Sequence, residues 1–195
     1  MLVPLEVPFH RFAEVFDRAK AAHPKDPNAV VLSTVDQAGR PSSRVVLLKG
    51  FDGEGFVIFT NYESRKGKEL TGQRAAALCF YWPETDEQVR VEGAAQKVTA
   101  AESDEYFATR ARGSQLGAWA SLQSQVLTSR DALDQRLAAF EKKYEGQGVP
   151  RPPHWGGFRI KPTRIEFWKA RESRLHDREV YVKAGEQWDV SLLNP

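Results

Sequence analysis

The sequence has little of several residue types on which whole classes of protein depend. It contains one cysteine and four histidines in 195 residues. One cysteine cannot form an intramolecular disulfide, and no two histidines or cysteines stand at zinc-ligand spacing. Cys79 lies in the apolar run 75–82, which indicates a buried, inert thiol rather than a nucleophile. We therefore expect neither a disulfide scaffold nor a bound metal.

Excess charge of one sign and long hydrophobic runs are lacking too. The 28 basic and 26 acidic residues leave a net charge of +2, which excludes the broad basic surface of a general nucleic-acid-binding protein. The apolar runs have the length of strands, and residues 1–6 lack the features of a signal peptide. We expect one soluble, cytoplasmic domain that spans residues 1–195, because this length suits a single core.

Hydrophobic periodicity predicts a mainly β fold with flanking helices (α+β). From Phe9 to Ala19, apolar residues recur at steps of three and four, which predicts an amphipathic helix. Further helices are expected after Ser64 and over residues 100–112, 115–122 and 129–144. Strands are expected at 29–35, 42–49, 56–60, 75–82, 88–98, 155–160, 163–168, 178–183 and 187–192. Short turns make the first three strands an antiparallel meander, and the whole set suggests a small barrel.

The stretch Arg174-Leu175-His176-Asp177-Arg178 carries a cationic or proton-carrying group at every second position. In an extended chain, Arg174, His176 and Arg178 would share one face. Such a face needs water or a charged ligand against it. Two interpretations stay open, an anion-binding strand and a solvated edge strand that uses charge against aggregation.

Two further cationic clusters have the composition of phosphate sites. Arg65 and Lys66 occupy the first turn of the helix after Ser64, where free N–H groups favour anions. Tyr106, Arg110 and Ser114 follow at steps of four, which aligns them on one stripe if the helix is continuous. Plain surface helices remain the alternative for both.

Three isolated polar residues on strands have ambiguous roles. Arg44 and Lys49 flank an apolar run, and their odd separation puts them on opposite faces of a regular strand, so both could be solvated strand ends. Gln88 could bond to a heterocycle or cap its strand.

Across nearly its whole length the chain resembles the pyridoxamine 5'-phosphate oxidase family. The matching segments are Arg44–Lys49, Phe59–Lys66, Glu87–Val89, Tyr106 with Arg110 and Ser114, Gly117–Trp119, Gln123–Ser124, Trp155–Phe158, Ile165–Trp168 and Arg174–Arg178. The resemblance implies an antiparallel, FMN-binding split β-barrel. It also implies a homodimer with FMN at the interface, in which residues 155–195 supply dimerisation and substrate strands.

The resemblance further implies the activity and the site. The activity is oxidation of pyridoxamine and pyridoxine 5'-phosphate to pyridoxal 5'-phosphate, with O2 as acceptor and H2O2 as product. Residues implied for FMN are Arg44, Val45, Val46, Leu47, Leu48, Lys49, Phe59, Thr60, Arg65, Lys66, Gln88, Gln123, Ser124, Trp168 and Arg178. Residues implied for the substrate are Lys49, Tyr106, Arg110, Ser114, Arg174 and His176, of which the last two are the catalytic pair.

Two departures from the family pattern keep alternatives open. The N-terminal segment, residues 1–28, is shortened, and Leu192 stands where the family usually has arginine. The alternatives are a sister flavin oxidase of the phenazine-pathway type and a non-catalytic protein that binds flavin or pyridoxal phosphate. His176 could take a proton or only orient the substrate.

Overall fold

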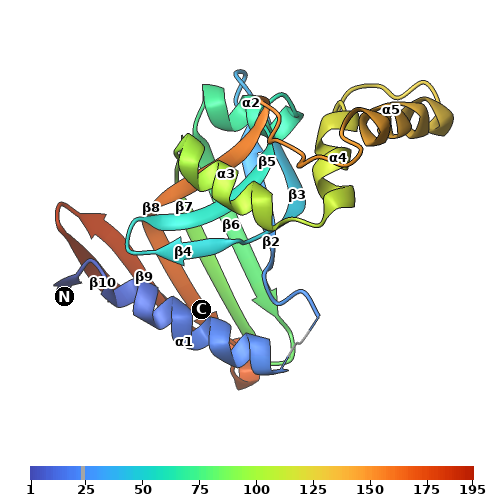
Figure 1. Ribbon diagram of the computed structural model, residues 1–195. Helices are drawn as coiled ribbons and strands as arrows, with labels where there is room; N and C mark the ends of the chain where they lie inside the picture. The colour runs from blue at the N-terminus through green and yellow to red at the C-terminus, as the bar shows by residue number, and fades with distance from the viewer. Residues whose placement is uncertain (23–24) are drawn as a thin grey trace.

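An antiparallel β-sheet organises the computed structural model, which describes residues 1–22 and 25–195 (Figure 1). Pro24, expected to help end the first helix, lies outside the described residues. The strands are β1 (Leu2–Pro4), β2 (Ala29–Val35), β3 (Pro41–Leu47), β4 (Gly50–Asp52), β5 (Gly55–Asn61), β6 (Ala75–Trp82), β7 (Glu87–Lys97), β8 (Trp155–Lys169), β9 (Asp177–Ala184) and β10 (Gln187–Leu192). The helices are α1 (Val7–Ala22), α2 (Arg65–Gly72), α3 (Ala100–Thr109), α4 (Arg112–Ala120) and α5 (Arg130–Lys143), with a 3-10 turn η1 (Glu172–Arg174). The expected mainly β class with flanking helices is confirmed.

The strand order is β1-β10-β9-β8-β7-β6-β2-β3, with β5 paired to β4 and β8. The expected meander of the first three long strands is therefore wrong, because β5 leaves β3 and joins β8 instead. Nearly all of β5 is buried, so it needs cover on both faces, which a position between sheet and helices provides. The chain at 50–52, expected to be a turn, forms the short strand β4.

Strand β8 is a single element of 15 residues, where two strands, 155–160 and 163–168, were expected. Its partner β7 shifts register between Glu92 and Gly93, which lets the chain pass Pro162 without ending the sheet. Gly93 permits this, because a Cβ there would collide with the carbonyl of Lys161. The long strand thus carries residues at its two ends into different parts of the molecule.

Helix α1 covers one face of the sheet, as its periodicity predicted (Figure 1). Phe12 is fully buried and makes edge contacts with Phe51, Phe56 and Phe80 at centroid distances of 4.8, 4.9 and 5.2 Å. Burial of one such side chain contributes about 1.5–3 kcal/mol, so this aromatic cluster anchors the helix to the sheet.

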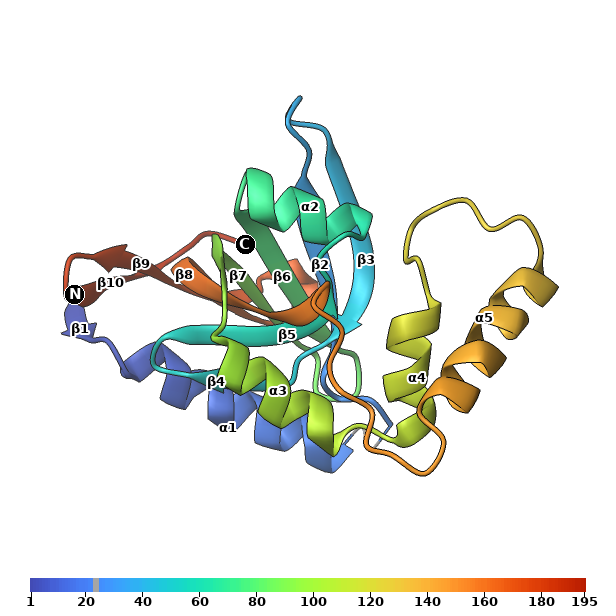
Figure 2. The same ribbon diagram turned by 45° about the horizontal axis from the view of Figure 1, so that its top comes forward.

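Helices α4 and α5 project from the sheet as a paired arm (Figure 2). One helix was expected over 100–112, but α3 ends at Thr109, Arg110 is extended (ψ 144), and α4 begins at Arg112. The Arg112 guanidinium donates to the carbonyls of Tyr144 and Gln147 and so ties the start of α4 to the end of α5. The expected cap at Ser114 is therefore wrong, since Ser114 lies within α4.

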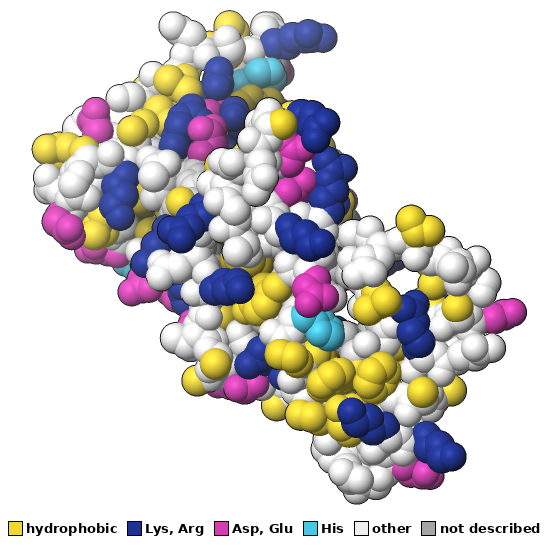
Figure 3. Space-filling model, turned by 90° about the horizontal axis from the view of Figure 1, so that it is seen from above, with side chains coloured by type: hydrophobic (Ala, Val, Ile, Leu, Met, Phe, Trp, Pro, Cys, Tyr) yellow, Lys and Arg dark blue, Asp and Glu magenta, His cyan; other side chains and the backbone are white. Residues whose placement is uncertain are grey.

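The surface carries mixed charge. Seen from above, lysine and arginine side chains are interspersed with acidic and hydrophobic ones (Figure 3). Within residues 1–22 and 25–195, every helix is too short or too polar to cross a membrane. Small clusters, rather than one broad basic face, therefore decide where anions can bind on this side.

Candidate functional site

A cleft of about 680 Å³ lies between β3, β5, α2 and the α3–α4 connection. The predicted site residues that line it are Val45, Val46, Leu47, Lys49, Phe59, Thr60, Lys66, Tyr106, Arg110, Ser114 and Gln123. We call this the first cleft. It brings together side chains from segments that are distant in sequence, which is what a ligand site requires.

Stacked rings form one wall of the first cleft. The Phe59 ring stacks on the rings of Tyr106 and Trp155, with centroid distances of 4.0 and 5.6 Å. The Arg110 guanidinium lies 4.5 Å from the Trp155 ring centroid. Burial lowers the pKa of Arg110 from its ordinary value. Its Nη1 atom is buried and has no hydrogen-bond partner within residues 1–22 and 25–195. A buried guanidinium edge of this kind favours an anionic ligand.

Tyr106, Arg110 and Ser114 meet in this cleft although they do not share a helical stripe. Tyr106 belongs to α3, Arg110 follows its last residue, and Ser114 belongs to α4. The break between the two helices, and not a step of four, brings them together. Trp155 also lines this cleft, although the sequence indicated it only as part of the matching segment Trp155–Phe158 and assigned it no role in the site.

The start of α2 forms the other end of the first cleft. The Ser64 hydroxyl accepts a hydrogen bond from the Gly67 amide and caps the helix, as expected. The Lys66 ammonium donates to Gln123 Oε1 at 3.3 Å, and Thr60 donates to the same oxygen at 3.3 Å. Burial, and next the positive charge of Arg44, lower the pKa of Lys66. An anion bound here would offset both the burial of the Lys66 ammonium and its repulsion by Arg44.

A buried carboxylate, Glu69, holds two of the predicted cations beside this helix start. Arg65 Nε donates to Glu69 at 2.9 Å, and Arg44 Nη2 lies 3.3 Å from it. Burial alone would raise the pKa of Glu69, but hydrogen bonds from Thr34, Arg65 and Ser42 outweigh burial and lower it. Sequence reasoning missed Glu69, whose pairing depends on how α2 packs against β2 and β3.

Strand β3 offers backbone groups to the same cleft. The Leu48 amide donates to the Asn28 carbonyl on the β2 side at 2.8 Å, whereas the Lys49 amide donates to Val57 on β5. Because backbone direction alternates along a strand, Val45 and Leu47 direct their N–H and C=O groups away from β2. The Leu48 side chain is buried in the core, and Leu48 does not line the cleft.

A second cleft, of about 300 Å³, lies where β8 ends and β9 begins. The predicted residues that line it are Gln88, Trp168, His176 and Arg178. Arg178 donates to the buried Glu166 and to the carbonyl of Asn194 in the C-terminal tail. Cys79 is half-buried rather than fully buried, and its thiol lies 3.6 Å from Gln88 Oε1.

The expected shared face of Arg174, His176 and Arg178 does not form. Arg174 belongs to the turn η1, with φ of 61°, and the strand begins only at Asp177. Arg174 is exposed and lines neither cleft, although His176 lines the second. Ser124, with φ of 70°, is exposed in the loop after α4 and also lines neither cleft. Such backbone strain in non-glycine residues often accompanies functional sites.

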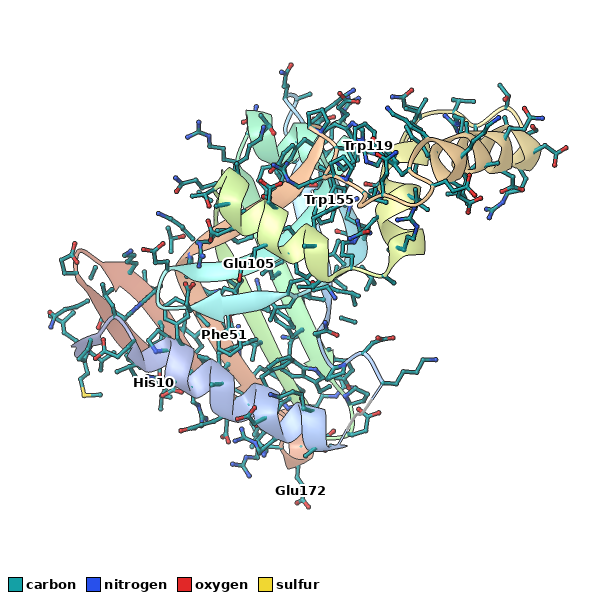
Figure 4. All side chains as sticks on the ribbon, in the orientation of Figure 1. His10, Phe51, Glu105, Trp119, Trp155 and Glu172 are labelled. Carbon is teal, nitrogen blue, oxygen red and sulfur yellow. The ribbon has the colours of Figure 1, made fainter. Side chains whose placement is uncertain are left out.

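The two clefts lie far apart within one chain. Trp155 lines the first cleft and Trp168 the second, at opposite ends of β8. At the rise of an extended chain this is roughly 40 Å along the strand. Figure 4 shows the same separation, with Trp119 and Trp155 near the α4–α5 arm and Glu172 at the far end. One chain alone therefore does not bring all the predicted residues to one ligand.

Comparisons with known proteins agree with the resemblance. A family model described as pyridoxamine 5'-phosphate oxidase matches residues 16–169. A model described as the C-terminal dimerisation region of pyridoxine 5'-phosphate oxidase matches residues 155–195. The chain is similar to the pyridoxine/pyridoxamine 5'-phosphate oxidase of Myxococcus xanthus, with 61% identity over 96% of this chain and 91% of that protein. For the same-named protein of Rubrobacter xylanophilus, identity is 54% over 96% and 87%.

Solved structures support the same fold. The chain is similar to PhzG from Burkholderia lata in complex with tetrahydrophenazine-1-carboxylic acid, with a TM-score of 0.91, 34% identity, and coverage of 96% and 92% of the two chains. A pyridoxamine 5'-phosphate oxidase-related, FMN-binding protein from Nostoc punctiforme, at 18% identity and a TM-score of 0.74 over 95% and 96%, shares the fold. The fold is thus the split barrel that the resemblance implied. From the two family models and the close relatives together, the chain belongs to the pyridoxamine 5'-phosphate oxidase family.

Proposed function

We propose that the chain is an FMN-dependent oxidase that makes pyridoxal 5'-phosphate. Pyridoxine 5'-phosphate and O2 give pyridoxal 5'-phosphate and H2O2, while pyridoxamine 5'-phosphate, O2 and water give the same products and ammonia. The observation that carries this proposal is the pair of anion-seeking clusters in the first cleft, Arg110 with Ser114 and Lys66 with its neighbours. The names of the close relatives support it.

The residues around α2 fit the phosphate of FMN. Lys66 is half-buried with a lowered pKa, Arg44 and Arg65 stand beside it, and the capped helix start directs N–H groups outward. A phosphate monoester carries about −1.5 to −2 charges at neutral pH, which three cations and Glu69 would balance. The outward N–H and C=O groups of Val45 and Leu47 suit the polar edge of a flavin ring. When bound, FMN would supply the two-electron redox chemistry, as the acceptor of the substrate's electrons and then as their donor to O2.

The other anion-seeking cluster of the first cleft, Arg110 with Ser114, would hold the substrate phosphate. Arg110 and Ser114 supply donors, Tyr106 adds a hydroxyl, and Lys49 stands at the rim with its ammonium 5.9 Å from the Tyr106 ring centroid. Charge-assisted hydrogen bonds each contribute about 1.5–3 kcal/mol, so three or four would fix a phosphate firmly. The chain's work is then to orient the substrate and to exclude water.

A homodimer would complete each site. The C-terminal region matches a dimerisation model, and the second cleft carries Gln88, Trp168, His176 and Arg178 at the end of β8 remote from the first cleft. We propose that the partner's second cleft closes over the first, which would place Arg174 and His176 against the substrate ring. Exposed apolar side chains on β2, β3 and β6, namely Val31, Val45, Leu47 and Tyr81, suit burial by a second copy.

A sister activity on a phenazine precursor is the second candidate. It is favoured by the likeness to PhzG, whose structure holds tetrahydrophenazine-1-carboxylic acid. Such a ligand has a carboxylate but no phosphate, so it would leave the donors of Arg110, Ser114 and Tyr106 only partly used. The higher identity to proteins named as phosphate-ester oxidases favours the first candidate.

The deciding experiment is to purify the chain, load it with FMN, and record its visible spectrum and peroxide release. We expect a yellow protein that releases H2O2 with pyridoxamine and pyridoxine 5'-phosphate and little with the unphosphorylated vitamers. Flavin binding without peroxide release would indicate a non-catalytic carrier. Equal rates with and without the substrate phosphate would overturn the role of Arg110 and Ser114.

A further inference from the structure

His176 receives a hydrogen bond from the main chain that bears on its chemistry. The backbone N–H of Arg171 donates to His176 Nδ1 at 3.2 Å. The imidazole ring packs against Trp168 with a centroid distance of 4.7 Å and an interplanar angle of 46°. Both contacts come from within this chain and involve neither a partner nor a ligand.

The turn between β8 and β9 is shaped to make this bond. Ser173 and Arg174 both have left-handed backbone conformations, with φ of 54° and 61°, which fold the chain back on itself. The Leu175 amide donates to the Glu172 carbonyl at 3.1 Å and closes the turn. The Arg171 side chain in turn donates to Asp177 Oδ2 at 2.7 Å. Arg171 therefore makes two bonds across this turn: its backbone amide bonds to His176, and its guanidinium bonds to the next residue, Asp177.

We propose that the Arg171 amide fixes neutral His176 as the tautomer that carries hydrogen on Nε2. In neutral imidazole one nitrogen donates and the other accepts, and an N–H directed at Nδ1 requires Nδ1 to be the acceptor. Nε2 therefore presents a hydrogen-bond donor. That Nε2 faces the substrate rests on the proposed function. Arg171, which acts through His176, is then a positioning residue.

The consequence is that His176 orients the substrate and does not take its proton. A general base needs a free lone pair on the nitrogen that faces the reactant, and here that nitrogen carries hydrogen. A donor at this place suits an acceptor atom on the substrate ring, such as the phenolic oxygen or the ring nitrogen. The sequence left open whether His176 takes a proton or only orients the substrate, and the hydrogen bond from the Arg171 amide favours the second role.

The tautomer can be measured directly by nitrogen NMR on protein labelled with ¹⁵N-histidine, without substrate and at a pH where imidazole is neutral. We expect the Nδ1 of His176 to resonate as an unprotonated nitrogen and Nε2 as a protonated one. His154 is an internal reference, because its Nε2 lies 3.1 Å from the Ala118 carbonyl and must also carry hydrogen. The spectrum of His176→Gln assigns the signal by its loss. The opposite tautomer at His176 would overturn the proposal, whatever the enzyme's activity.

A pair of variants tests the role in the reaction. The amide nitrogen of glutamine reaches the position of Nε2, whereas asparagine can only replace Nδ1. Under the proposal, His176→Gln keeps the rate of anaerobic flavin reduction by saturating pyridoxine 5'-phosphate within about tenfold of the parent, and His176→Asn falls at least tenfold below it. If His176 were a general base, neither amide could replace it, and both would lose about 10²–10⁴-fold.

The controls keep the two proposals distinguishable. His10→Gln, on α1 and exposed, should match the parent in rate and in flavin content. FMN content and circular dichroism report whether each His176 variant is folded. A parent that binds FMN but oxidises no phosphorylated vitamer would defeat the proposed function, and the NMR result would still decide the tautomer. Equal large losses in the two His176 variants would defeat the donor role alone.

Discussion

Replacing Glu166 with glutamine should destabilise the protein because one buried carboxylate holds three arginines. The Glu166 side chain is 2% exposed, and its oxygens lie 2.7 Å from Arg164, 2.8 Å from Arg178 and 3.5 Å from Arg90. Removal of one partner from a fully buried ion pair costs about 3–5 kcal/mol. These arginines are a quarter to two-fifths exposed, so water screens part of the loss, and we expect about 2–3 kcal/mol.

Thermal unfolding of the flavin-free protein measures the loss of stability in Glu166→Gln. At about 2–4 °C per kcal/mol for a chain of this size, Glu166→Gln should unfold roughly 5–10 °C below the parent. Glu92→Gln is the matched control, since Glu92 meets Arg90 and Arg164 at 3.0 and 2.9 Å but is 42% exposed. Its cost should stay below about 1 kcal/mol. An equal shift in both variants, or none in Glu166→Gln, would refute the argument from burial.

The same carboxylate gives the effect a pH dependence. Burial would raise the pKa of Glu166, but hydrogen bonds from Arg164 and Arg178 outweigh burial, so its folded-state pKa lies below the ordinary value. A lowered folded-state pKa means that its stabilisation is fully present above the unfolded pKa, roughly 4.3, and is lost as pH falls further. The gap in unfolding temperature between parent and Glu166→Gln should therefore narrow below about pH 4.

Three other predictions concern the first cleft and its supports. Lys66→Ala should weaken FMN binding by about 10- to 100-fold through the loss of one charge-assisted hydrogen bond. Fluorescence titration measures this, and riboflavin, which lacks the phosphate, should be affected little; equal weakening would argue against a phosphate contact. Arg110→Ala should raise KM for pyridoxamine 5'-phosphate by about tenfold or more and leave FMN affinity unchanged, and an unchanged KM in peroxide assays would contradict the phosphate seat. Thr99→Ala removes the capping box of α3 and should cost about 1 kcal/mol of unfolding free energy in urea without changing flavin content, whereas flavin loss would mean that α3 shapes the site more than its contacts suggest.

The sequence predicted most helices and strands because their apolar periodicity and caps are local. It could not predict pairings that depend on register, such as β5 beside β8. For the same reason it missed Glu69 and Glu166, whose cationic partners include residues from other elements. Isolated acidic residues on helices and strands usually face water, so neither carried a sequence signal.

The candidate site followed a different pattern. Tyr106, Arg110 and Ser114 were grouped correctly in space but for the wrong reason, since a helix break and not a common stripe unites them. The period of two in Arg174–Arg178 suggested a strand, yet two left-handed residues turn the chain before Asp177. Backbone conformations of this kind in serine and arginine leave no mark in sequence.

The placement of the two clefts at opposite ends of β8 has a genetic consequence under the proposed dimer. A chain with Arg110→Ala is defective in its first cleft, and a chain with Arg178→Ala is defective in its second. When the two variants are mixed, a hybrid dimer contains one chain of each kind. One of its sites then has both defects, and the other site, made from the two unchanged clefts, has none. Random exchange of subunits would make roughly a quarter of all sites intact. Two impaired alleles of this chain would then partly complement each other, because the mixture contains intact sites and either variant alone contains none.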